Sequence, residues 1–301
     1  PITGADHVGG HLIVETMRDV ASAVSVYTLD GGFVREGELP GLGVASGFGG
    51  DPARTETFYS YESLNQPPAL YRYDVATGES EVFRAPELTF NPDDYVVSQT
   101  FYESTGGAQI PMFVAHHRDV DPNGVRPTLI YGYGGFAITR RPDFDVRRLQ
   151  WMEMGGVYAI ANLRGGSAYG RDWHDARRLA NKQNVFDDFI NAGHALIDMG
   201  WTSPDHLAIH GRSNGGLLVG AVANQAPDLF AAALPAVAAA LVHKAIGGQL
   251  TCVFVDTGLM RGLGKGAIAH GMDRVGIAHD DQRCGLVGFT EPGSERQHIR
   301  Q

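Results

Sequence analysis

Alternating apolar and polar residues mark out short strands in the first part of the chain. Six segments have the alternation and the β-branched or aromatic content of strands: His11–Met17, Ala23–Leu29, Phe33–Glu36, Thr57–Tyr61, Leu70–Tyr73 and Ser80–Arg84. Turns with acidic residues and glycine follow two of them, at Asp30-Gly31-Gly32 and Asp74–Glu79. Short antiparallel strands joined by such turns are typical of sandwiches, barrels and propellers. The repeated unit favours propeller blades, and the pattern covers too little chain for a whole propeller.

The pattern changes near Phe90. From there on, longer apolar runs typical of buried strands alternate with segments in which the apolar residues have helical spacing. Five strands are expected, at Tyr95–Tyr102, Gln109–His116, Pro127–Tyr131, Val157–Asn162 and Leu207–His210. The spacing of apolar residues predicts helices at Asn184–Met199 and Gly216–Ala226. Because strands that alternate with helices usually form a parallel sheet, the second part of the chain is predicted to have an α/β fold.

A Gly-x-Ser-x-Gly motif follows the predicted strand Leu207–His210, with Ser213 between Gly211 and Gly215. A strand, a sharp turn and a helix are the context of a nucleophile elbow, in which the serine hydroxyl stands clear of the sheet. Side chains at the two glycine positions would collide with the neighbouring strand and helix. The helix N-terminus would direct N–H groups at a forming oxyanion. We therefore interpret Ser213 as a nucleophile, and the alternative is an ordinary strand-to-helix turn.

Composition and charge narrow the classes of partner. The 301 residues are 43% hydrophobic and 19% charged, which is ordinary for a globular protein. The formal net charge of −10 argues against nucleic acid and against an anionic membrane surface as partners. No apolar run reaches the roughly 18 residues of a membrane span. The sequence also opens in mid-pattern at Pro1, without a signal peptide, so we expect that it begins within a longer protein.

Cysteine and histidine usage predicts a location and argues against a metal site. The two cysteines, Cys252 and Cys284, are too few for a disulfide scaffold, and free thiols in a reducing compartment predict a cytoplasmic location. The 12 histidines are scattered, and neither a His-Glu-x-x-His nor a Cys-x-x-Cys pair occurs. We therefore expect neither a metal nor a cofactor.

A series of ordered motifs resembles the prolyl oligopeptidases, serine peptidases with an α/β-hydrolase domain and a β-propeller. The resemblance runs from about Ser46 to about Pro235 and rests on YVVSQTFY, IPMFV, YGYGGF, NLRGG, ANKQNVFDD, GRSNGGL and ANQAPDLF. It implies an α/β-hydrolase fold with an incomplete, mostly parallel sheet. The expected organisation is partial propeller blades in residues 1–85, part of the catalytic domain in 86–235, and a foreign or divergent tail in 236–301.

The resemblance also implies roles for four residues. Ser213 matches the nucleophile, and Asn214 would offer its backbone N–H to the oxyanion. Tyr133 matches the tyrosine whose hydroxyl completes the oxyanion hole, and Phe136 matches an aromatic wall of the pocket for the residue before the scissile bond. Without the resemblance, Tyr133 could be a buried aromatic at a strand end and Phe136 could be plain core. The family cleaves short peptides after proline, so short proline-containing peptides are the implied partners.

Two other polar residues lie in motifs of the family and are interpreted as structural. His174 stands in a Trp-His segment that the family shares without using it for catalysis. Arg164 in NLRGG is expected to brace loops and not to bind substrate.

The resemblance ends near Pro235. Residues 236–261 resemble instead the ATP-pyrophosphatase domain of glutamine-hydrolysing GMP synthetases, without the Ser-Gly-Gly-x-Asp-Ser loop that grips phosphate there. We interpret residues 235–240 as a junction between two unrelated sequences. Nucleotide binding by 236–261 is a minor alternative that the missing loop disfavours.

A serine nucleophile needs a general base and a carboxylate that orients it, and α/β-hydrolases carry both after the serine in the chain. The candidates are Asp280 or Asp281 for the acid and His298 for the base, and the alternative is that all three are solvated tail charges. We expect this chain to lack a working acid and base and to show little or no peptidase activity. The rival function is a non-catalytic α/β scaffold that binds peptides or partners.

Overall fold

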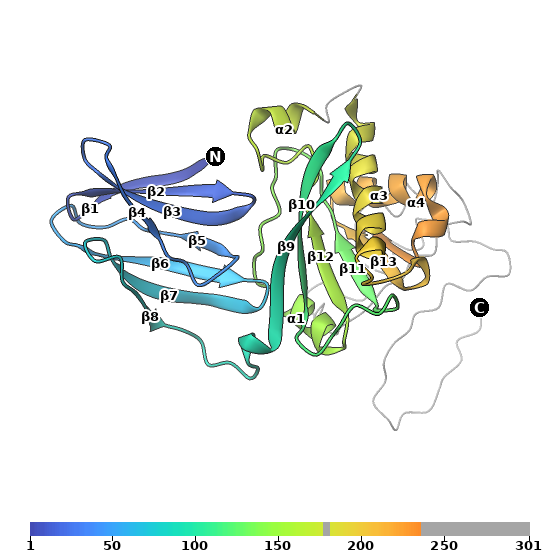
Figure 1. Cartoon of the computed structure of the whole chain (residues 1–301), viewed down its shortest axis with the longest axis horizontal. Coiled ribbons are helices and arrows are strands. Elements are labelled where there is room, and N and C mark those ends of the chain that lie inside the picture. Colours follow the sequence, from blue (N-terminus) through green and yellow to red (C-terminus); the bar gives the residue numbers. More distant parts are fainter. Residues whose placement is uncertain (177–180, 236–301) are drawn as a thin grey trace, which may run out of the picture.

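The computed structural model describes residues 1–176 and 181–235, which form three sheets (Figure 1). The first two sheets have four antiparallel strands each, in sequence order. Their strands are β1 (Ile2–Val8), β2 (His11–Arg18), β3 (Ala21–Thr28), β4 (Phe33–Gly37), β5 (Val44–Ser46), β6 (Glu56–Ser63), β7 (Gln66–Asp74) and β8 (Ser80–Arg84). These two meanders confirm the prediction of propeller blades.

The turns between the blade strands explain why the chain reverses where it does. Gly31 between β3 and β4 has φ +89°, and Gly78 between β7 and β8 has φ +85°, a region that glycine enters without a steric penalty. The sequence prediction missed β1, whose residues are mostly exposed, and β5, which has only three residues. Neither strand carries enough alternating apolar residues to reveal itself.

The third sheet has six strands in the order β14-β13-β11-β12-β10-β9. Its strands are β9 (Tyr95–Ser104), β10 (Ala108–His117), β11 (Thr128–Tyr131), β12 (Val157–Ala161), β13 (Leu207–Gly211) and β14 (Ala232–Pro235). The pairings from β12 to β14 are parallel, whereas β9–β10 and β10–β12 are antiparallel. The sheet is thus parallel in its helix-connected part, and the hairpin of β9 and β10 forms its antiparallel side.

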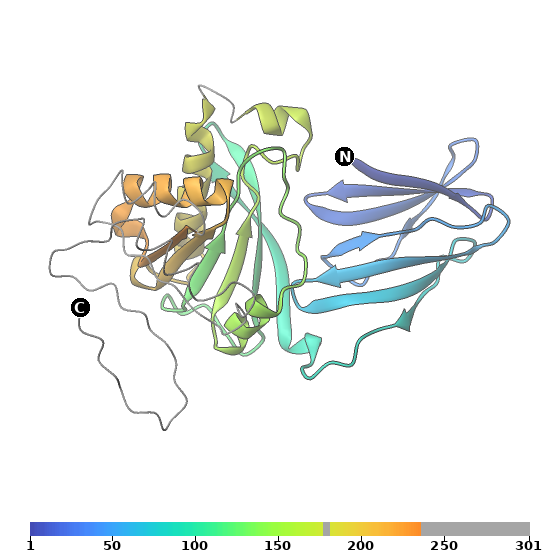
Figure 2. The ribbon, with the colours of Figure 1, turned by 180° about the vertical axis from the view of Figure 1, so that it is seen from behind.

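The helices cover both faces of this sheet (Figures 1 and 2). They are α1 (Val146–Glu153), α2 (Arg171–Asp175), α3 (Gln183–Asp198) and α4 (Asn214–Gln225), with 3-10 turns η1 (Pro92–Asp94), η3 (Pro204–His206) and η4 (Pro227–Leu229). Helices α3 and α4 pack on one face and α1 on the other. On β10, Met112 packs in the hydrophobic cluster that lies under α3 and α4, and Phe113 packs in the cluster that lies under α1. Both side chains are fully buried. None of the described helices is long and apolar enough to cross a bilayer.

The blades join the α/β domain on the face that α1 covers. Val20 in the β2–β3 turn and Leu64 in the β6–β7 turn are fully buried in the cluster that contains Phe113. The side chain of Gln99 on β9 donates a hydrogen bond to the carbonyl oxygen of Asp19. Figure 1 shows the hairpin of β9 and β10 beside the ends of the blade strands. The two parts therefore meet in one shared hydrophobic cluster, and the blades have a separate core of their own that contains Val26 and Tyr59.

A buried ion pair ties α3 to the sheet. Asp188 is completely buried, and its carboxylate accepts hydrogen bonds from Arg164 Nη2 at 2.6 Å and from the Arg164 backbone N–H at 3.0 Å. Ser104 Oγ at the end of β9 donates to the same carboxylate at 2.6 Å. Since the pair joins the loop after β12 to α3 and β9, Arg164 braces loops as predicted.

Replacing Asp188 with alanine is expected to lower the free energy of unfolding by about 3–5 kcal/mol, because it leaves the Arg164 guanidinium buried without its counter-charge. The matched control is Asp187→Ala. The Asp187 carboxylate is hydrogen-bonded to Thr105 and Gln183 near the surface, and its loss is expected to cost about 1 kcal/mol. Urea denaturation followed by circular dichroism measures both. Equal losses would show that the buried pair has no special weight.

Candidate active site

Ser213 occupies the turn between β13 and α4 in a strained backbone conformation. Its φ is +58° and its ψ −119°, a combination that residues with a side chain rarely adopt. The residue is exposed, whereas Gly211 and Gly215 on either side of it are buried. A serine held in this conformation at a strand-to-helix turn presents its hydroxyl above the sheet edge. The expected geometry of a nucleophile elbow is therefore present.

The two glycines of the motif are needed for close backbone contacts. A Cβ atom on Gly211 would overlap the carbonyl group of Gly215 in the first turn of α4. A Cβ atom on Gly215 would lie 2.5 Å from the carbonyl oxygen of Gly132, which follows β11. Because both obstacles are backbone atoms, no side-chain movement could relieve them. The elbow therefore closes only with glycine at these positions.

Tyr133 lies beside the elbow because β11 and β13 are parallel neighbours whose ends meet at the same edge of the sheet. The Gly132 N–H donates a hydrogen bond to the His210 carbonyl oxygen at 3.1 Å. The side chain of Asn214 also donates to the Tyr133 carbonyl oxygen at 2.6 Å. The sequence suggested only a backbone role for Asn214. Its amide side chain adds a clamp between the two turns.

Phe136 lies in the turn that follows Tyr133. It has φ +53° and its side chain is 68% exposed, so the alternative that it is plain core is wrong. The neighbouring Ala137 also has a positive φ, +55°, and its N–H donates to the Gly165 carbonyl oxygen at 3.1 Å. The turn thus holds an aromatic ring outside the core, near the edge that carries Ser213.

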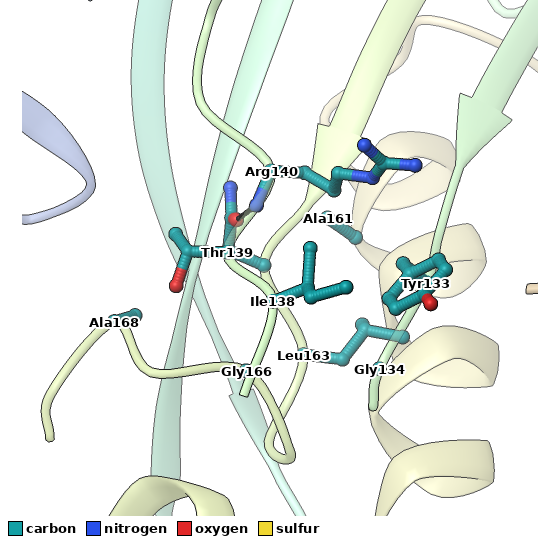
Figure 3. A pocket seen from close by; sticks show the side chains of 10 residues that line it. Tyr133, Gly134, Ile138, Thr139, Arg140, Ala161, Leu163, Gly166 and Ala168 are labelled. Carbon is teal, nitrogen blue, oxygen red and sulfur yellow. Dashed lines mark hydrogen bonds between the residues drawn. The ribbon is translucent and has the colours of Figure 1, made fainter. Parts of the chain in front are cut away.

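A small pocket is lined in part by the turn that carries Tyr133 (Figure 3). Its empty volume is about 210 Å³ including the open mouth, and its walls are Tyr133, Gly134, Ile138, Thr139, Arg140, Ala161, Asn162, Leu163, Gly166 and Ala168. The Arg140 guanidinium lies 4.9 Å from the ring centroid of Tyr133 and 5.1 Å from that of Tyr131. The sequence analysis missed this contact, because nothing in a loop sequence indicates where an arginine side chain points.

His210 ends the strand that leads into the elbow. Its ring packs edge-on against Tyr131 at 5.4 Å. Burial lowers the pKa of its imidazole, and the nearby cations Arg147, Arg148 and Arg212 lower it further. The His210 side chain is therefore neutral near pH 7.

Of the other residues that the sequence singled out, the structure describes His174 but not the candidates in the tail. His174 Nδ1 lies 3.1 Å from the Gly165 carbonyl oxygen, a contact that fixes a loop and fits the structural interpretation of this residue. Within 1–176 and 181–235, no histidine forms a hydrogen bond with the Ser213 hydroxyl, and no three potential metal ligands cluster. The candidates Asp280, Asp281 and His298, both cysteines and the stretch 236–261 lie outside the described residues.

Replacing Ser213 with glycine is expected to raise the free energy of unfolding by about 1 kcal/mol, because glycine relieves the backbone strain at φ +58°. Ser213→Ala is the matched control. It removes the same hydroxyl, which makes no capping hydrogen bond to α4, but it keeps the strain. The stability of this control is expected to stay within about 0.5 kcal/mol of the parent. Equal stabilities of the two variants in urea denaturation would contradict a strained elbow.

The lowered pKa of His210 predicts a loss of stability in weak acid. Its pKa in the folded state lies below the ordinary value near 6.5 that it has in the unfolded chain, so the unfolded state binds a proton first as the pH falls. This contribution is complete above about pH 6.5 and is lost as the pH falls towards the folded pKa. His210→Gln should therefore show a flatter dependence of the unfolding midpoint between pH 7 and pH 5. Parallel curves would exclude His210 as a source of the acid sensitivity.

Comparisons with known proteins agree with this geometry. Residues 142–247 match the model of the prolyl oligopeptidase family, and residues 2–86 match that of the prolyl oligopeptidase N-terminal beta-propeller domain. The prolyl endopeptidase of Elizabethkingia meningoseptica is 45% identical over 229 residues, which are 76% of this chain and 32% of that protein. The prolyl endopeptidase of Dictyostelium discoideum is 39% identical over 221 residues, which are 72% of this chain and 29% of that protein.

Solved structures give the same result. A prolyl endopeptidase structure with 46% identity superposes with a TM-score of 0.71, over 77% of this chain and 34% of that one. Prolyl oligopeptidase B from Galerina marginata, with 31% identity, reaches a TM-score of 0.72 over 78% of this chain and 34% of its own. This chain spans about a third of the length of the curated relatives that it matches. The two family models together cover more than half of this chain, which belongs to the prolyl oligopeptidase family.

Proposed function

We propose that the protein is a serine peptidase of the type that cleaves short peptides after proline through an acyl-enzyme on Ser213, and that this chain, without a working acid and base, has little or no such activity. The observation that carries this proposal is the strained Ser213 elbow with the Tyr133 turn clamped beside it. The relatives named prolyl endopeptidase support the choice of proline as the residue before the scissile bond.

The proposed reaction begins when Ser213 Oγ attacks the peptide carbonyl carbon and gives its proton to a general base. The negative charge that develops on the carbonyl oxygen is held by the Tyr133 hydroxyl and the Asn214 backbone N–H. The carbon–nitrogen bond then breaks, and the protonated base returns its proton to the leaving amine. Water attacks the resulting ester, the base takes a proton from it, and Ser213 recovers its hydroxyl hydrogen as the peptide acid leaves.

Phe136 would contact the proline ring in this scheme. Its 68% exposed ring and its position after Tyr133 support that role. The general base and its carboxylate are the parts for which the described residues offer no candidate beside Ser213. His298 and Asp280 or Asp281 are the candidates later in the chain; the alternative is that they are solvated tail charges, and we expect this chain to lack a working acid and base.

The remaining proposals concern the domain organisation, the peptide partners and the cellular location. We assign partial blades to residues 1–85, part of the catalytic domain to 86–235 and a divergent tail to 236–301, and the propeller-domain match to 2–86 supports the first of these. Short proline-containing peptides are the proposed partners. One solved Galerina marginata relative is bound to a 35mer substrate, which supports a peptide ligand. A cytoplasmic location is part of the proposal and rests on the low cysteine content.

A non-catalytic α/β scaffold is the second candidate function. It is favoured by one observation, that no histidine of residues 1–176 and 181–235 forms a hydrogen bond with the Ser213 hydroxyl. Such a scaffold could still bind peptides along the edge that carries Phe136.

Treatment of the full chain with a fluorophosphonate probe separates the two candidates. We expect slow formation of an adduct on Ser213, found by mass spectrometry of the digested protein, and none in Ser213→Ala. Tyr133→Phe should slow the reaction by about a hundredfold, because one oxyanion donor is lost. Turnover of a proline peptide substrate should be little or none.

Each result has a counterpart that would reject it. Folded protein that forms no adduct on Ser213 would support the scaffold. Turnover at the rate of a complete peptidase would show that a working base and acid are present in this chain.

A further inference from the structure

The ring of Tyr133 is buried, but its hydroxyl is free. Tyr133 is 8% exposed and belongs to the hydrophobic cluster that lies under α1. Among the described residues, its hydroxyl has no hydrogen-bond partner. The buried side-chain atoms that lack a partner do not include this oxygen, so it still reaches solvent. Such a hydroxyl is a preorganised donor for a ligand only if the ring that carries it is held in one orientation.

The guanidinium of Arg140 lies over that ring. Its central carbon is 4.9 Å from the ring centroid of Tyr133 and 5.1 Å from that of Tyr131. Arg140 Nη2 also donates a hydrogen bond to the Tyr131 hydroxyl at 2.5 Å. Because a planar cation is attracted to the electron-rich face of an aromatic ring, one guanidinium joins the two tyrosines and hinders rotation of the Tyr133 ring.

The backbone of Arg140 is held in place as well. Its N–H donates to Oδ1 of the buried Asn162 at 3.1 Å. Within 1–176 and 181–235, no carboxylate forms an ion pair with the Arg140 guanidinium. The neighbouring Arg141 has a different partner, since its Nη2 donates to Ser22 Oγ in a blade. Arg140 is thus fixed through its backbone and through the tip of its side chain, without a carboxylate that would draw it away from the rings.

This placement of Arg140 is unfavourable for stability. Its Nε is buried and has no hydrogen-bond partner among the described residues. A buried donor without a partner costs free energy, and a carboxylate would be a stronger partner for the guanidinium than two ring faces. An unpaired buried donor beside a proposed catalytic group is expected where a geometry is kept at the expense of stability.

We propose that Arg140 is a positioning residue of the oxyanion hole, which holds the Tyr133 ring so that its free hydroxyl points at the substrate oxygen. The inference rests on the proposed function, because it requires that Tyr133 donates to the oxyanion. Arg140 does not touch the substrate in this scheme and acts through Tyr133. Its effect should therefore vanish when the Tyr133 hydroxyl is removed, whereas an arginine that only stabilises the fold would act with or without that hydroxyl.

The test measures how fast a fluorophosphonate probe labels Ser213 in the full chain. Ser213 Oγ bonds to phosphorus, fluoride leaves, the serine proton passes to water, and the phosphoryl oxygen takes the place of the oxyanion. Arg140→Met keeps an apolar stem but removes the charge and the planar fork, and it should slow labelling about tenfold. In a Tyr133→Phe background, the same substitution should change the rate by less than about twofold.

Arg147→Met is the matched control. It makes the same change in net charge, but the Arg147 side chain is 69% exposed and pairs with Asp145 at 2.6 Å. This control should be labelled at the rate of the parent. Arg140→Lys keeps the charge without the planar fork, so it should recover only part of the lost rate. If circular dichroism shows that Arg140→Met does not fold, Arg140→Lys takes its place, and its smaller slowing should also vanish in the Tyr133→Phe background.

The outcomes separate this inference from the proposed function. Folded parent protein that forms no adduct on Ser213 would reject the proposed function and the role of Arg140 with it. Labelling of the Arg140 variants as fast as the parent would reject the role of Arg140 alone. Equal slowing with and without the Tyr133 hydroxyl would show that Arg140 does not act through Tyr133. Equal slowing by Arg147→Met would reduce the effect to net charge.

Discussion

The approach of three backbone segments at the end of β11 and β13 controls the geometry of the site. A Cβ atom on Gly211 would overlap the Gly215 carbonyl group, and a Cβ atom on Gly215 would lie 2.5 Å from the Gly132 carbonyl oxygen. At Gly132 a Cβ would also lie 2.6 Å from the Phe189 ring on α3 and 2.8 Å from Leu218 on α4. The helices that cover the sheet can therefore reach its edge only because side chains are absent at that point. The position of Ser213 follows from this packing, and its strain is balanced by contacts that the rest of the sheet supplies.

The buried ion pair and the apolar core stabilise this arrangement in different ways. The apolar residues of α3 and α4 hold the helices on the sheet without fixing their direction, because the hydrophobic effect is not directional. The bidentate contact between Arg164 and Asp188 is directional and sets the position of α3 relative to β9 and to the loop after β12. Burial of two charges costs hydration, so the pair contributes more to a unique geometry than to net stability.

Much of the architecture could be predicted from the sequence, because strand and helix periods were clear where burial was strong. The limits of α3, β10 and β13, which all carry several buried residues, were within a residue or two of the structure. The short helix α1 and the strand β14 were missed. For α1, only Leu149 and Met152 of its eight residues are buried, which leaves a weak periodic signal. The nucleophile candidate was found because its motif encodes a local turn. The side-chain clamp of Asn214 and the stacking of Arg140 were not, since they depend on tertiary contacts between segments far apart in the chain.

The burial of the blade turns in the α/β core has a consequence for how the chain acquires its structure. Val20 and Leu64 leave the ribosome well before Phe113 and Tyr158, the residues that surround them in the finished core. Until those partners are made, two apolar turns at the ends of the blades are exposed to water, and the loop that must close is long. The blades are therefore vulnerable to aggregation during synthesis, and their docking onto the sheet is a late step that depends on residues far downstream in the chain.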